Sequence, residues 1–158
     1  MYIDDFLKLS DAQALTATAV GTNVIDLTIE RSVGSGEPMA VFFSVGVAAD
    51  QTTGDEDYTF DVEYAAAADQ STGIEQLVGR RIFESGTPTS PAQDADLLVA
   101  GFLFSIPIPP MTAGEVEQFL GVRYTLAGTT PTITVDAWVA PLSMGDQYTS
   151  YADNVTIG

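Results

Sequence analysis

The sequence predicts an all-β protein, an antiparallel β-sandwich with little helix, for which a jelly roll is the arrangement we expect. Three observations lead to this prediction: apolar side chains recur at every second position, turn-forming residues separate these segments, and helical periodicity is scarce. The alternation is clearest in "YTFDVEY", residues 58–64, where aromatic and aliphatic side chains occupy one face. The other face carries Thr59, Asp61 and Glu63, which we expect to point outward into solvent.

Further strand-like segments follow along the chain, at residues 23–30, 38–47, 97–108, 119–128 and 131–139. Turn sequences such as "GSGEP", "TTGDED" and "AGTTP" fall between them. The segment 97–108 is apolar on both faces, which predicts a strand covered on both sides. Trp138 alternates with the apolar side chains of its strand, so we expect it on the opposite sheet face, either packed under a loop or exposed as an interface aromatic.

Helix is expected in two short places only. "DDFLKLSDAQAL", residues 4–15, is compatible with one or two turns, and "TAGEVEQFL", residues 112–120, begins with a capping-box spacing. The length of 158 residues fits one domain, and no linker-like composition divides it. We expect a sandwich domain over residues 1–144, which includes an N-terminal segment 1–14, followed by a polar C-terminal tail at 145–158.

Composition excludes several classes of function. Histidine and cysteine are absent, and 22 acidic side chains accompany only five basic ones, for a net charge of −17. The chain therefore has no disulfide, no Ser-His or Cys-His nucleophile and no histidine ligand for a metal. A surface this acidic is repelled by nucleic acid and by anionic membranes. We expect no enzyme, no catalytic residue, no cofactor, no direct nucleic-acid contact, no membrane association and no signal peptide.

The densest acidic stretch is "AADQTTGDEDYTFDVEY", residues 48–64. Its six carboxylates are Asp50, Asp55, Glu56, Asp57, Asp61 and Glu63. With Asp50 at the first position of a calcium loop, Gly54 would stand at the fifth and Asp55 at the sixth, where that loop requires glycine. The pattern fails, so we predict no metal site and interpret the stretch as a solvated acidic hairpin tip between two strands. A weak adventitious cation site is the alternative.

Bases are so few that the pair Arg80–Arg81 in "GRRIFESG" is a candidate contact site. Neighbouring strand residues point to opposite faces, so at most one of the two is expected on the core side. One interpretation is an ion pair with one of the many acids. The other is an arginine anchor that meets an acidic groove on a partner.

The chain ends supply the remaining candidate contact residues. Apolar and aromatic side chains lie close to the N-terminus, and two tyrosines lie in the polar tail, where each offers contact area at low entropic cost. These residues are Tyr2, Ile3, Phe6, Leu7, Tyr148 and Tyr151. For the N-terminal group, closure of one end of the protein's own sandwich is an equally good interpretation.

Four longer stretches carry a family resemblance. "MYIDDFLKLSDAQALTATAVGTNVIDL", "GEPMAV", "GRRIFESGTPTSPAQDADLLVAGF" and "TPTITVDAWVAPLSM" together resemble the capsid cement, or decoration, proteins of tailed bacteriophages of the Bordetella-podophage type. The resemblance spans about residues 1–144. It implies a jelly roll, commonly dimeric, that binds the outer surface of a shell built from an HK97-like major capsid protein and bridges neighbouring capsomers. It thus implies the virion exterior as location, with synthesis in the bacterial cytoplasm, and the major capsid protein and further copies of the chain as partners.

Two other classes stay open on the residues alone. One is a carbohydrate-binding β-sandwich, such as a lectin-like or adhesion module, which outward aromatics such as Trp138 and a calcium-binding acidic loop would support. The other is a hydrolase with paired carboxylates, which requires a cleft that holds two acids at a fixed spacing.

Overall fold

The computed structural model describes residues 5–29, 33, 36–74, 76–89, 91–110 and 116–144. Its elements, in chain order, are the 3₁₀ turn η1 (Asp5–Leu7), the strands β1 (Lys8–Leu15), β2 (Ala19–Val20), β3 (Ile25–Asp26), β4 (Met39–Val47), β5 (Asp57–Ala65), β6 (Gln76–Glu84) and β7 (Gln93–Asp94), the 3₁₀ turn η3 (Ala95–Leu97), and the strands β8 (Leu103–Ile108), β9 (Phe119–Ala127) and β10 (Ile133–Pro141). The residues 145–158, which the sequence assigns to a polar tail, lie outside the described part.

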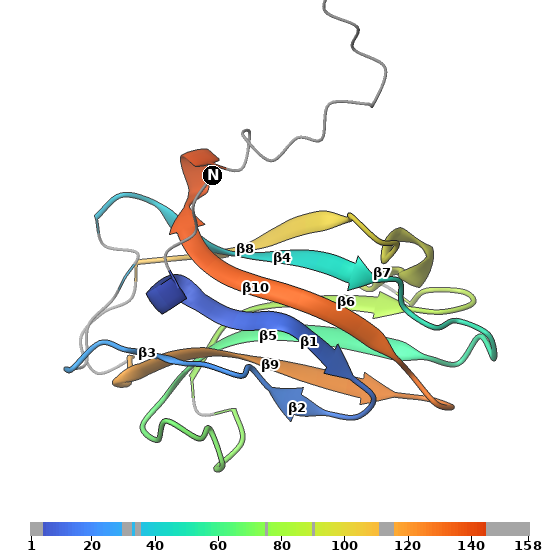
Figure 1. Cartoon of the computed structure of the whole chain (residues 1–158), viewed down its shortest axis with the longest axis horizontal. Coiled ribbons are helices and arrows are strands. Elements are labelled where there is room, and N and C mark those ends of the chain that lie inside the picture. The colour runs from blue at the N-terminus through green and yellow to red at the C-terminus, as the bar shows by residue number, and fades with distance from the viewer. Residues whose placement is uncertain are drawn as a thin grey trace, which may run out of the picture.

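The strands form two sheets packed face to face. The front sheet has the order β1-β10-β4-β8, and the back sheet has the order β2-β9-β5-β6-β7, with β3 also paired to β9. In Figure 1 the front sheet faces the viewer, and β5 and β6 lie behind it. The chain crosses between the sheets repeatedly, and the pairs are antiparallel except β6 with β7. This strand order is that of a jelly roll, so the predicted fold class is confirmed.

The core lies between the sheets and follows the predicted alternation. Phe60 of β5 contacts four other rings edge to face, with ring centroids 5.1–5.7 Å apart. These rings belong to Phe43, Phe83, Phe104 and Tyr124, which come from both sheets. Edge-to-face pairs at this spacing add stability beyond the burial of area. The core of this cysteine-free protein therefore has an aromatic centre.

The helix predicted near the N-terminus is wrong over most of its length. Only Asp5–Leu7 form a single 3₁₀ turn, and Lys8–Leu15 form β1, which pairs with β10 through two irregularities of register. Leu9 and Leu15 are buried in the core. A helix would have left the edge of β10 unpaired, so tertiary pairing overrides the local preference here.

Two predicted strands are shorter than the sequence indicates. Of 97–108 only Leu103–Ile108 form β8, because the chain first makes the turn η3 and then a turn at Gly101, whose φ is 87°. β8 is the edge of the front sheet and is not covered on both sides, since Pro107 is exposed. Of 23–30 only Ile25–Asp26 pair with β9, and Ile29 is 62% exposed.

Candidate functional site

The acidic stretch 48–64 connects the two sheets, since β4 belongs to the front sheet and β5 to the back sheet. The predicted turn is present, with Gly54 at a φ of 73°, but it is a crossover and not a hairpin. The Glu56 carboxylate is fully buried and accepts backbone N–H bonds from Thr53 (3.0 Å), Gly54 (2.9 Å) and Asp55 (3.1 Å). The Thr53 hydroxyl also donates to it, and this bond, aided by the backbone donors, lowers the pKa of Glu56 to about 2.

The neighbouring acids serve the same loop as hydrogen-bond acceptors. Asp55 accepts from the Thr53 hydroxyl (2.7 Å) and from the backbone N–H and hydroxyl of Thr129 (3.1 and 2.9 Å), and these bonds lower its pKa. Asp50 accepts the Thr52 N–H at 3.1 Å. The carboxylates thus hold the loop together and do not converge on one point. Within the described residues, no group of three acidic side chains is placed to hold a metal ion.

The prediction that Asp61 and Glu63 point into solvent is wrong, because both side chains are fully buried. They do lie on the outer face of the back sheet, opposite Phe60 and Val62. Asp61 accepts from Arg80 Nε at 2.6 Å and Arg80 Nη2 at 2.9 Å, a bidentate pair. Arg123 Nη2 donates to Glu63 Oε1 at 2.9 Å. Buried carboxylates require such partners, and two of the chain's five bases supply them.

Gln70 covers this part of the outer face. Its Nε2 donates to Glu63 Oε1 at 2.8 Å, and its backbone carbonyl accepts from Arg123 Nη2 at 2.6 Å. The Gln70 side chain lies flat on Gly121, where an added Cβ would approach the amide nitrogen to 2.4 Å. Neither Gln70 nor Gly121 is among the residues predicted from the sequence. The available signal was a glycine inside an otherwise apolar strand, which often marks the close approach of another group.

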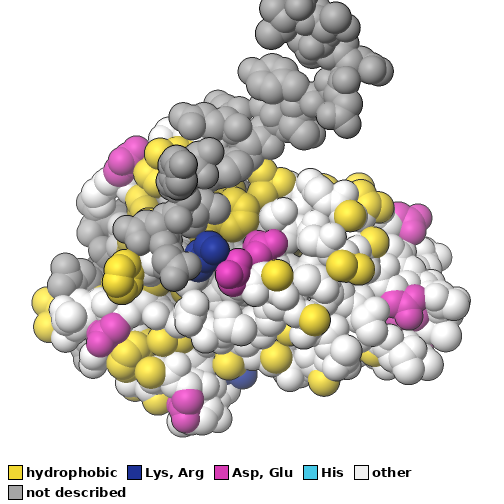
Figure 2. All heavy atoms as spheres, viewed as in Figure 1, with side chains coloured by type: hydrophobic (Ala, Val, Ile, Leu, Met, Phe, Trp, Pro, Cys, Tyr) yellow, Lys and Arg dark blue, Asp and Glu magenta, His cyan; other side chains and the backbone are white. Residues whose placement is uncertain are grey.

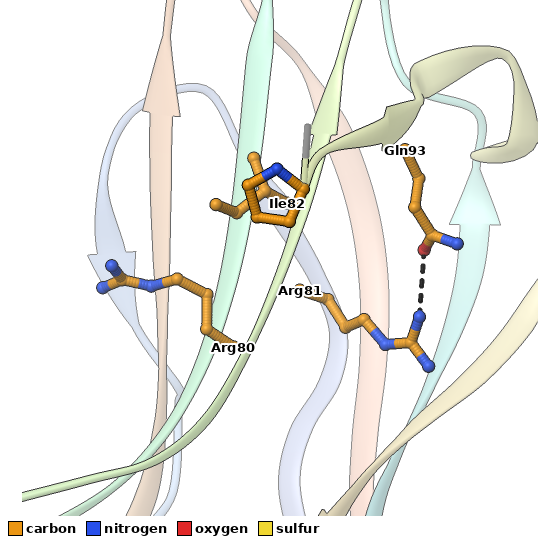
Figure 3. Close-up of a pocket in the computed structure, with 5 residues that line it drawn as sticks. Arg80, Arg81, Ile82 and Gln93 are labelled. Atoms are coloured by element: carbon orange, nitrogen blue, oxygen red, sulfur yellow. Dashed lines mark hydrogen bonds between the residues drawn. The ribbon is translucent and has the colours of Figure 1, made fainter. Parts of the chain in front are cut away.

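The arginine pair divides as the alternation predicts. Arg80 lies on the outer face with Asp61, while Arg81 pairs in register with Phe60 and lies on the core side at the margin of the sheet. Figure 3 shows the two side chains leaving β6 in opposite directions. Arg81 donates to Gln93 Oε1 at 3.2 Å and forms no ion pair within the described residues. The ion-pair interpretation is therefore correct for Arg80. Arg81 has no carboxylate partner among the described residues, and its role as an anchor for a partner stays a prediction.

A hollow of about 400 Å³ lies at this arginine pair. It is lined by Arg80, Arg81 and Ile82 of β6, by Gln93 of β7 and by Pro91. Among the described residues, β6 pairs on this side only through Phe83 and Glu84, with β7. The backbone of Gln76–Ile82 consequently forms an open sheet edge beside the hollow.

The N-terminal candidates are only partly described. Phe6 is 87% exposed and Leu7 is at the border of exposed and half-buried, while the neighbouring Leu9 fills the core. Tyr2, Ile3, Tyr148 and Tyr151 lie outside the described residues. The assignment of these six side chains to a contact surface therefore stays a prediction.

The outer face of the front sheet carries a second apolar cluster. Trp138 lies on this opposite face, as predicted, and stacks on Phe42 with ring centroids 6.1 Å apart. Ala40 and Ala140 complete the cluster, and Trp138 is only 6% exposed. Figure 2 shows apolar side chains spread over this side of the molecule and carboxylates mostly near its rim. Because the Trp138 ring is buried, it is not offered to a sugar as a stacking platform.

None of the helices in the described part of the chain is long and apolar enough to cross a membrane.

The fold and the site define an all-β sandwich protein whose buried charges brace its own back sheet and whose β6 edge is open. Comparison with known families then identifies it further: residues 9–139 match Bbp16, and the chain belongs to this family of Bordetella phage proteins. A search of the curated proteins finds no significant match.

Proposed function

We propose that this phage protein is a capsid cement protein, which binds the outer surface of an HK97-like shell and bridges neighbouring capsomers to stabilise the particle. The observation that carries the proposal is membership of the Bbp16 phage family over residues 9–139, in a chain that folds as a jelly roll. The major capsid protein is the proposed partner, together with further copies of this chain in a dimer or other homo-oligomer.

The charge supports an exterior position. A net charge of −17 disfavours contact with packaged DNA, which carries about one negative charge per 1.7 Å of duplex axis. On the outside of the shell the same charge lies away from the packaged DNA and favours solubility. The proposed role needs no catalytic residue and no cofactor.

The contact surface is proposed to include the exposed N-terminal side chains Phe6 and Leu7 and the arginine pair of β6. Tyr2, Ile3, Tyr148 and Tyr151 belong to the same proposal on sequence grounds. Each contact is modest, but a molecule that binds two neighbours at once is retained far more strongly than one that binds a single site.

The test is binding to shells assembled from the major capsid protein of the same phage. We expect the protein to sediment with these shells and to appear on their outer surface in a cryo-electron microscopy map. Deletion of residues 2–7, which stops before β1, should reduce occupancy while the β-rich circular dichroism spectrum stays unchanged. Density inside the shell, or no binding to any form of it, would contradict the proposal.

A further inference from the structure

The open edge of β6 has the features of a strand-docking site. On one side β6 pairs with β5 along most of its length, and on the other side, within the described residues, only Phe83 and Glu84 pair, with β7. Pro91 and Gln93 line the hollow of about 400 Å³ together with Arg80, Arg81 and Ile82 of β6. Exposed edge groups are a ready template for another extended segment. A further strand can thus add to the back sheet through main-chain hydrogen bonds to Gly79–Ile82.

This edge of β6 is packed closely against β8 of the opposite sheet. An added Cβ at Gly79 would come within 2.4 Å of Ile106 Cγ2 in β8, so the edges of the two sheets are packed directly together. An edge packed in this way loses little entropy when a partner strand is added, which favours docking over rearrangement.

Arg81 indicates the chemistry of the partner. The chain has 22 acidic side chains, yet the Arg81 guanidinium forms no ion pair with any described carboxylate and donates only to the Gln93 amide oxygen. A guanidinium binds a carboxylate more strongly than a neutral amide, and often through two parallel bonds. Arg80 differs, because its guanidinium already forms a bidentate ion pair with Asp61 on the outer face of the back sheet.

We propose that the β6 edge at Gly79–Ile82 binds an extended acidic segment of a partner protein, which adds as a strand and places a carboxylate on Arg81. Main-chain hydrogen bonds would supply the affinity, and the Arg81 pair would select an acidic segment over a neutral one. Arg81 is thus a specificity residue for this contact. If the protein is a cement protein, as proposed above, the capsid shell supplies the acidic segment. In that form the inference rests on the proposed function.

A different role for Arg81 has to be distinguished. Charged side chains on edge strands also prevent edge-to-edge association of copies. An arginine with that role would keep the protein monodisperse and would contribute nothing to the binding of an acidic segment.

The first experiment is a titration of the protein with a capped peptide, Thr-Glu-Val-Glu-Val-Glu-Thr, followed by NMR of the backbone amides at physiological salt. We expect saturable shifts confined to Gly79–Ile82 and to Gln93. Because the protein carries a charge of −17, general electrostatics oppose the binding of this peptide, so a saturable signal cannot come from non-specific attraction. A peptide with Gln in place of each Glu should bind roughly tenfold more weakly.

Matched variants complete the test. Arg81→Ala should weaken binding of the acidic peptide by roughly tenfold. Lys8→Ala removes the same charge from the front sheet, where Lys8 pairs with Asp11, and should leave binding unchanged. The inference is overturned by an absence of saturable shifts up to about 5 mM peptide, by shifts elsewhere, or by equal binding of Arg81→Ala. Aggregation of Arg81→Ala without loss of peptide binding would assign Arg81 to edge protection instead.

Binding of the same variants to capsid shells separates this inference from the proposed function. If Arg81→Ala loses shell occupancy and Lys8→Ala does not, the β6 edge is the contact with the shell. If the wild-type protein binds the peptide but no shell, the cement role fails and the acidic-strand site stands. If it binds shells and not the peptide, the cement role stands and the inference fails.

Discussion

The outer faces of the two sheets are both buried in part, but by opposite chemistry. On the front sheet, Phe42 and Trp138 stack within an apolar cluster. On the back sheet, Glu63 is buried with Arg123 under Gln70. In a simple sandwich both faces would be polar and solvated. The outer face of the front sheet is instead buried by apolar contacts. The outer face of the back sheet is buried with ion pairs, and its stability depends on the whole network of these pairs.

The contrast between the two outer faces shows how a chain with 22 acids and five bases distributes its charge. Arg80 and Arg123 neutralise the two buried carboxylates, and Glu56 and Asp55 rely on backbone and hydroxyl donors instead. Few bases are then left for the surface, and Arg81 is one of them. The comparison predicts that the back face is sensitive to loss of one charge and that the front face is sensitive to loss of volume.

The largest effect is expected for Arg123→Met. It leaves Glu63 buried without its cation and the Gln70 carbonyl without its donor, which should lower the free energy of unfolding by about 3–5 kcal/mol. Urea denaturation measures this change. The control is Lys8→Met, which removes an exposed ion pair with Asp11 and should cost about 0–1 kcal/mol. Equal losses for the two variants would mean that the back face does not depend on its buried charges.

Trp138→Ala is expected to lower the free energy of unfolding by about 3 kcal/mol, because it removes a large buried ring from Phe42 and leaves a cavity. Urea denaturation measures this loss. A loss well under 1 kcal/mol would indicate that the apolar cluster adds little to stability.

Gly121→Ala tests the cover of the back face. The new methyl group would collide with the Gln70 amide, and we expect a loss of about 1–3 kcal/mol. Gly46→Ala on the front sheet is the matched control, because its nearest neighbour would be at an ordinary 3.6 Å. Hydrogen exchange at the Gln70 and Glu63 amides should become faster in Gly121→Ala only. Unchanged exchange there would contradict the proposed cover.

The smallest effect is a gain, expected for Asp57→Asn. Asp57 lies opposite Glu84 on the back sheet, and burial, followed by repulsion from Glu84 and Asp55, raises its pKa. A raised pKa means that the folded state binds the proton more readily, so the charged form costs stability above that pKa. Asn should add about 0.5 kcal/mol near pH 7, and the gain should vanish well below pH 3.8, where Asp57 is protonated in both the folded and the unfolded state.

A matched control for this gain is Asp69→Asn. Asp69 accepts hydrogen bonds from Ser71, which lower its pKa, so its loss should give no stabilisation. The measurement is the free energy of unfolding of both variants between pH 3 and 7. A pH-independent gain for Asp57→Asn, or an equal gain for Asp69→Asn, would contradict the repulsion.

The period-two pattern by itself determines much of the fold. It placed Tyr58, Phe60, Val62 and Tyr64 on the core face, where all four are buried, and it placed Trp138 on the opposite face. It failed where tertiary pairing replaced local preference, at β1, and where a turn interrupted an apolar run, before β8. Periodicity reports which side chains share a face, and carries no information on strand partners that are distant in the chain.

The candidate site shows the same division. The sequence by itself determined that bases are scarce, that Arg80 and Arg81 point apart, and that the acidic stretch does not match the calcium-loop pattern. Only the tertiary structure decided that Asp61 and Glu63 are buried, that Gln70 covers Glu63, and that Arg81 lies at an open edge with no described carboxylate beside it. The reason is physical: burial of a charge depends on what is packed over it, and those atoms come from loops and strands that no local pattern places.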